Sequence, residues 1–135
     1  MSFEISNGME EWEFEFNWLR VRHVVKSRFQ RETLPNLNAM LFLIGIQELG
    51  RWQTAFTKEE KQDLMHIAVC RLMSYDGIYE FAGRDQDGWP HWRQVKTVPV
   101  RGVKDQEQRL KEHVITYFQE LEAENGGLEK NDEEE

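Results

Sequence analysis

The segment from residue 35 to residue 49 limits the fold more than any other part of the chain. It begins at Pro35 and is followed by Gly50, which are a favoured first-turn residue and a favoured terminating residue of a helix. Its apolar side chains lie on nearly every side of a helical projection: Leu37, Met40, Leu41, Phe42, Leu43, Ile44, Ile46 and Leu49. A helix that is apolar all round must be buried, so the rest of the chain has to cover it.

Three further segments carry apolar stripes at helical spacing and can supply that cover. They span residues 17–31, with Asn17 as candidate N-cap, residues 57–75, and residues 105–122. In the second, Thr57 and Glu60 form a capping box in which each side chain satisfies a backbone amide of the other residue. The stripe residues are Trp18, Val21, Val25 and Phe29, then Leu64, Ile67, Ala68 and Leu72, then Leu110, Val114, Tyr117, Phe118 and Leu121.

The stretch near 78–98 has a different texture. Two runs of strand-like composition, 78–82 and 92–98, flank residues 83–90, which are rich in turn formers. The sequence therefore predicts a mainly α protein: an antiparallel bundle of about four helices with a small β-hairpin or ordered loop near 78–98. We expect residues 1–124 to form one domain and residues 125–135 to form a disordered acidic tail.

Residues 12–18 alternate aromatic and polar side chains, with Trp12, Phe14, Phe16 and Trp18 in every second position. A period of two is typical of an extended strand, so residues 1–16 are predicted to form an arm with an aromatic face. An earlier helical start is the alternative, because acidic residues stabilise helix N-termini.

Charge, cysteine content and hydropathy indicate in which cellular compartment the protein is expected. The net charge of −8 divides into −5 over residues 1–17, −7 over residues 120–135 and +4 over residues 18–119. The single cysteine, Cys70, fits a reducing compartment. The apolar run 39–46 is too short to cross a bilayer, and no leader pattern is visible. We expect a cytoplasmic protein with no membrane association.

Candidate reactive residues are few. His66 and Cys70 lie four residues apart on one expected helix, but a zinc helix usually carries two histidines around a glutamate. A catalytic thiol needs an exposed site near positive charge, and Cys70 lies among apolar residues. The chain is therefore expected to hold no metal or cofactor, and enzyme activity is left open, with a non-enzyme favoured.

Two charged residues fall on apolar helix faces. Glu48 is the only charge within residues 35–49, and Arg71 lies on the apolar arc of residues 57–75. Because a lone buried charge is costly, we expect these two side chains to pair or to line one polar pocket. The pairing reading is favoured; the alternative is a small-ligand-binding bundle or an enzyme built around Glu48, Arg71 and His66.

Basic and aromatic residues suggest another alternative, a nucleic-acid-associated protein. Its basic patch would draw on two stretches, residues 20–31 and 93–104, and its aromatic contacts on the loop after residue 88. The candidate bases are Arg20, Arg22, Lys26, Arg28, Arg31, Arg93 and Lys96, and the candidate loop residues are Trp89, His91 and Trp92.

The run Asp87-Gly88-Trp89-Pro90-His91-Trp92, together with residues 41–50, resembles a family of small bacterial proteins of unknown function. The resemblance spans about residues 15–120 and implies no activity. The leading interpretation therefore comes from the residues: a non-enzymatic helical protein-interaction or scaffold module that binds a protein partner or itself. Its aromatic residues at 12–18 and 89–92 are assigned with equal weight to an interface and to the core.

Overall fold

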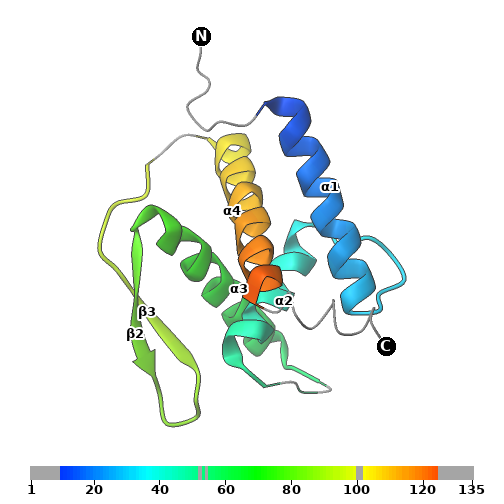
Figure 1. Ribbon diagram of the computed structural model, residues 1–135. Helices are drawn as coiled ribbons and strands as arrows, with labels where there is room; N and C mark the ends of the chain where they lie inside the picture. The colour runs from blue at the N-terminus through cyan, green and yellow to red at the C-terminus, as the bar shows by residue number, and fades with distance from the viewer. Residues whose placement is uncertain (1–9, 52, 54, 100–101, 125–135) are drawn as a thin grey trace.

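The computed structural model describes residues 10–51, 53, 55–99 and 102–124. Four helices, α1 (Glu11–Arg28), α2 (Leu37–Leu49), α3 (Lys58–Met73) and α4 (Val103–Glu124), are joined by a 3-10 turn, η1 (Ser74–Asp76), and an antiparallel hairpin of β2 (Tyr79–Arg84) and β3 (Pro90–Gln94). The expected class, mainly helical with a small hairpin, is confirmed (Figure 1). The expected acidic tail, 125–135, and the first nine residues of the expected arm lie outside the described residues.

Helix α2 is the most buried element, as its all-round apolar surface requires. Asn36 is its N-cap, and the Asn36 side chain accepts a hydrogen bond of 2.9 Å from the Ala39 N–H. Gly50 ends the helix with a φ of 84°, a left-handed conformation that glycine adopts without strain. The buried side is formed by Met40, Leu41, Leu43, Ile44, Gly45, Ile46 and Leu49.

Gly45 lets α2 and α3 approach closely. A Cβ atom at position 45 would lie 2.2 Å from the Leu64 carbonyl oxygen and 2.7 Å from the Leu64 carbonyl carbon. Both atoms belong to the α3 backbone, so no side-chain movement could relieve the overlap. Glycine is therefore required here by packing, against its own poor helix propensity.

Helix α1 corrects the expectation of an extended arm. It begins at Glu11 rather than Asn17, after Glu10, whose N–H donates a 3.1 Å hydrogen bond to the Glu13 side chain. It also ends three residues earlier than expected, at Arg28. Residues two apart in a helix lie about 200° apart around its axis. The alternating aromatics therefore divide between two opposite faces of one helix instead of lining one face of a strand.

The inner face of α1 completes the core. Phe14, Trp18, Val21 and Val25 are buried and form one cluster with residues of α2, α3 and α4. Helices α1 and α4 contact each other and run in the same direction, and α1 lies at one edge of the molecule (right in Figure 1). The hairpin lies at the opposite edge, beside α3.

The hairpin is fastened to the end of α2. Arg84 donates hydrogen bonds to the Glu48 carbonyl oxygen at 2.8 Å and to the Leu49 carbonyl oxygen at 3.2 Å. These carbonyls belong to the last turn of α2, which has no helical partners for them. The capping box of α3 is also present, with Thr57 and Glu60 exchanging bonds of 2.9 and 3.0 Å.

Replacing Gly45 by alanine should lower the free energy of unfolding by about 1–3 kcal/mol, because the added methyl group overlaps the α3 backbone. Helix propensity alone would give the opposite sign, since alanine is favoured over glycine by about 1 kcal/mol. Denaturant unfolding followed by circular dichroism measures the difference. Gln47→Ala, at an exposed position of the same helix, is the control and should change it by less than about 0.5 kcal/mol.

Candidate functional site

The structure brings Glu48 and Arg71 together. The Arg71 Nε atom lies 3.8 Å from the Glu48 Oε2 atom, and the two side chains are 26% and 23% exposed. The Tyr117 hydroxyl of α4 donates a 2.7 Å hydrogen bond to the same glutamate oxygen. Three helices therefore meet at one carboxylate, which is the pairing expected from the cost of burying either charge alone.

Aromatic rings surround Arg71. Its guanidinium carbon lies 4.9 Å from the Tyr75 ring centre and 5.4 Å from the Tyr117 ring centre. The Tyr75 hydroxyl donates a 2.7 Å hydrogen bond to Glu120. Burial, with the acceptor Glu120 beside it, raises the pKa of Tyr75 to about 12, and burial next to Glu48 raises the pKa of Tyr117 as well. Both phenols therefore stay protonated at neutral pH.

The hollow beside this cluster is small. Its volume is about 140 Å³, whereas ligand pockets usually exceed about 300 Å³. His66, the third residue considered for a polar pocket, does not line it. The geometry explains a polar tie between helices and leaves little room for a ligand.

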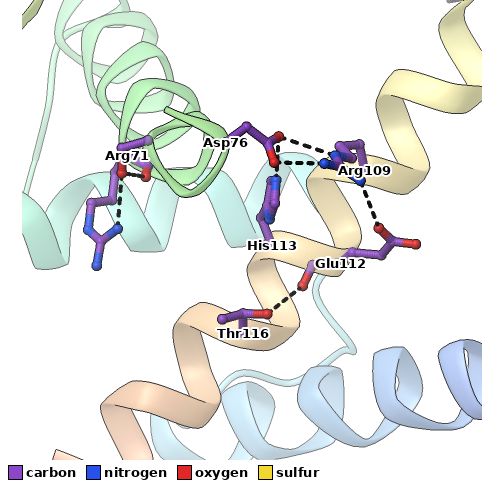
Figure 2. A network of polar contacts seen from close by, with 7 residues as sticks. Arg71, Asp76, Arg109, Glu112, His113 and Thr116 are labelled. Atoms are coloured by element: carbon purple, nitrogen blue, oxygen red, sulfur yellow. Dashed lines mark hydrogen bonds and ion pairs between the residues drawn. The ribbon is translucent and has the colours of Figure 1, made fainter. Parts of the chain in front are cut away.

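A second polar cluster joins η1 to α4. Arg109 donates hydrogen bonds of 2.7 and 3.2 Å to the two carboxylate oxygens of Asp76, and His113 Nε2 lies 2.8 Å from Asp76 Oδ2 (Figure 2). Arg109 also lies 4.0 Å from Glu112, one turn along α4. Burial alone would raise the pKa of Asp76, but the hydrogen bonds from Arg109 and His113 outweigh it and lower the pKa.

A cavity of about 650 Å³ opens next to Asp76, between α3, β2, residues 96–99 and α4. Its walls combine apolar side chains (Val69, Met73, Ile78, Val98, Pro99 and Leu110) with polar and charged ones (Asp76, Lys96, Thr97, Asp105, Gln106, Gln108, Arg109 and Glu112). Asp76 and Arg109 reach its edge but are bound to each other. Five charged side chains line the cavity, and three of them, Asp76, Arg109 and Glu112, interact with one another, while Lys96 and Asp105 complete the set.

His66 and Cys70 are neighbours without a reactive arrangement. The Cys70 sulfur lies 3.5 Å from His66 Nε2, but Cys70 is only 1% exposed. Burial raises the pKa of the Cys70 thiol to about 11, so the nucleophilic thiolate is scarce at neutral pH. Within the described residues, no three His, Cys, Asp or Glu side chains are arranged to hold a metal ion.

The loop residues considered for binding have separate roles. Trp89 packs against the apolar cluster at the end of α2, whereas exposed His91 lies 3.0 Å from Asp85, inside the hairpin turn. Trp92 packs edge-on against Phe81 across the hairpin, with ring centres 5.6 Å apart. The side chains of Trp89 and Trp92 therefore pack within the molecule. His91 is the most exposed of the three.

The candidate basic residues do not form one patch. Those on α1 and those on or after β3 lie at opposite edges of the molecule (Figure 1). Arg20 lies 3.5 Å from Glu122 and Arg93 lies 3.0 Å from Glu80, so each faces a carboxylate of its own chain. Arg22 donates a 2.8 Å hydrogen bond to the Pro35 carbonyl. Lys26, Arg28, Arg31 and Lys96 lie at or near the surface.

The outer face of α1 is the largest concentration of exposed apolar side chains on any described element. Trp12 is 68% exposed, Phe16 is 61% exposed and Leu19 is 45% exposed. Spacings of four and three residues place all three on the side of α1 opposite its buried face. The remaining exposed large apolar residues among those described, Phe81, Val95 and Val103, lie on other elements.

No protein-family model matches the chain, and no curated protein or solved structure is similar to it. The resemblance of residues 87–92 and of α2 to small bacterial proteins remains an expectation. None of the described helices is long and apolar enough to cross a bilayer.

The sequence did not reveal two features of the structure: the exposed stripe of α1 and the cluster around Asp76. The α1 stripe was hidden by the alternation of residues 12–18, although the positions 12, 16, 19 and 23 already have the spacing of one helix face. The Asp76 cluster joins residues more than thirty positions apart, and no local spacing signals such a contact.

Asp76→Asn should lower the free energy of unfolding by about 1–3 kcal/mol at neutral pH, because charged hydrogen bonds to Arg109 and His113 are lost. The folded pKa of Asp76 lies below the unfolded value of about 3.9. Its contribution is therefore complete above that value and disappears as the pH falls through the folded pKa.

Unfolding measured from pH 7 down to pH 3 should show the stability difference between wild type and Asp76→Asn shrinking in acid. Asp63→Asn, at an exposed carboxyl on α3, is the matched control and should differ little from wild type at any pH. A difference for Asp76→Asn that is constant across the range would contradict the assignment.

Proposed function

We propose that this chain is a non-enzymatic helical interaction module, which binds a protein partner through the outer face of α1. The observation that carries the proposal is the exposed stripe of Trp12, Phe16 and Leu19. Large aromatic side chains are the residues that contribute most binding energy at protein interfaces. The buried face of α1 makes the contacts of this helix with the core, and the exposed stripe takes no part in them.

The state of the polar residues supports the same proposal. Asp76 is paired with Arg109, and Glu48 is paired with Arg71. His91 lies against Asp85. The one thiol is buried. An enzyme needs at least one nucleophile or base that faces substrate, and a binding module needs only surface complementarity.

A chain with Trp12, Phe16 and Leu19 all changed to serine should unfold with nearly the wild-type free energy, within about 0.5 kcal/mol for each site. The reason is that these side chains are exposed. Denaturant unfolding of the purified chain measures this. Phe14→Ser is the matched control on the buried face and should cost several kcal/mol, about 3 or more.

Binding is tested by placing a photoreactive phenylalanine analogue at position 16 in living cells that produce the protein. We expect covalent adducts of discrete mass on illumination, identified by mass spectrometry. The same analogue at Gln119, an exposed position of α4, should give few or none. Serine at positions 12 and 19 should abolish the adducts.

The proposal fails if position 16 gives no more adducts than position 119. It also fails if the adducts persist after both serine substitutions, because the stripe would then not be the binding surface.

A further inference from the structure

We infer that the partner of the outer face of α1 is α1 of a second copy of this chain, packed antiparallel about a two-fold axis. The inference rests on the proposed function and names its partner. It follows from the spacing of the apolar residues and from the order of charges along α1.

The spacing fits helix-on-helix packing. Trp12, Phe16, Leu19 and His23 are exposed and follow one another at intervals of four, three and four residues. At about 100° per residue they lie within an arc of about 60°. This pattern is the seam of a two-helix coiled coil, in which side chains of one helix fit between those of the other.

The charges of α1 are divided between its two halves. Residues 11–18 carry Glu11, Glu13 and Glu15 and no base, whereas residues 19–28 carry Arg20, Arg22, Lys26 and Arg28 and no acid. Two copies packed parallel would align the two acidic halves and the two basic halves, and would leave Glu15 with Arg20 as the one kind of opposite-charge pair beside the seam. Two copies packed antiparallel place the acidic half of each helix on the basic half of the other, which selects that orientation.

The antiparallel register follows from the seam. Phe16 of one copy lies opposite Leu19 of the other, and Trp12 lies opposite His23. The flanking positions then place Glu15 near Arg22 of the second copy and Glu13 near Arg20 of the second copy. Two-fold symmetry repeats each pair, so four ion pairs border a short apolar seam.

The helix dipole explains only part of this charge order. Acids in the first turn and bases in the last turn stabilise any helix, which accounts for Glu11, Glu13, Lys26 and Arg28. The effect falls off within one turn, so it does not account for Glu15, Arg20 and Arg22. These three residues flank the seam.

The arginines remain able to reach a second copy. Arg20 has one contact at 3.5 Å with Glu122, and 40% of its side chain is exposed. Arg22 uses its Nε atom for the Pro35 carbonyl. A guanidinium group has five N–H donors, so both can hold a further carboxylate.

Sedimentation equilibrium of the full chain tests the inference first. We expect a reversible, concentration-dependent step from 16.2 kDa to twice that mass. Phe16→Glu should weaken the dimer by at least about tenfold. Gln119→Glu, which adds the same charge on exposed α4, should leave it unchanged.

The decisive experiment mixes two charge variants. Glu15→Arg and Arg22→Glu should each weaken self-association, because each copy then meets a like charge. Mixed together they should form a heterodimer at least about tenfold tighter than either homodimer, since one pair is restored with reversed sign and the other keeps its native sign. Circular dichroism checks that Arg22→Glu, which loses its bond to Pro35, still folds.

A second readout does not depend on Arg22. The photoreactive analogue at position 12 should attach to the peptide around His23 of the second copy. Parallel packing would attach it around position 12 instead.

A chain that stays at 16.2 kDa at high concentration overturns the inference. So does a mixture of charge variants that associates no better than its components, or attachment around position 12. Adducts to a different protein from position 16 in cells overturn the second copy as partner while the proposed function stands. A dimer that appears only after residues 1–9 are deleted would show that those residues occupy the stripe, which also overturns it.

Discussion

The close contact of α2 with α3 at Gly45 determines where the other elements can lie. An apolar helix must be covered on every side. Helix α3 covers one side of α2 so closely that its backbone at Leu64 lies against Gly45. Helices α1 and α4 contribute to the same core cluster as α2, and the hairpin covers its end through Trp89 and Arg84. Helix α1 therefore lies at the surface, with one face packed on the core and the other exposed to solvent.

Two clusters of polar residues connect elements that are distant in sequence. Glu48 and Arg71 join α2 to α3, and Tyr117 adds α4 to the same carboxylate. Asp76, Arg109 and His113 join η1 to the first half of α4. Helix α4 follows the hairpin and a connection whose described residues, 95–99 and 102, form no helix or strand, so its position depends on contacts distant in sequence. Paired, half-buried charges of this kind fix how neighbouring elements align.

The sequence predicted those parts of the fold that depend on local pattern. Helices α2, α3 and α4 begin within about two residues of their expected positions because local signals mark their starts. Pro35 was expected in the first turn of α2 but lies just before it, and Asn36 is the N-cap. The pairing of Glu48 with Arg71 was also predictable, because each is a charged residue on an otherwise apolar face of its helix. Residues 12–18 were assigned wrongly because aromatic alternation satisfies a strand, whereas in a helix it produces two aromatic faces. Only the buried positions Val21 and Val25, which continue the spacing of Phe14 and Trp18, distinguish the two.

That alternation is also the strongest argument about function. A helix that only completes a core needs one apolar face, and Phe14, Trp18, Val21 and Val25 already form it. Large aromatic residues on the opposite face lower solubility and gain nothing for the isolated fold. The same helix separates its charges into an acidic and a basic half beyond what its dipole requires. A surface that is both apolar and complementary to its own reversed copy has the properties of an interface, and no other described surface of this molecule combines them.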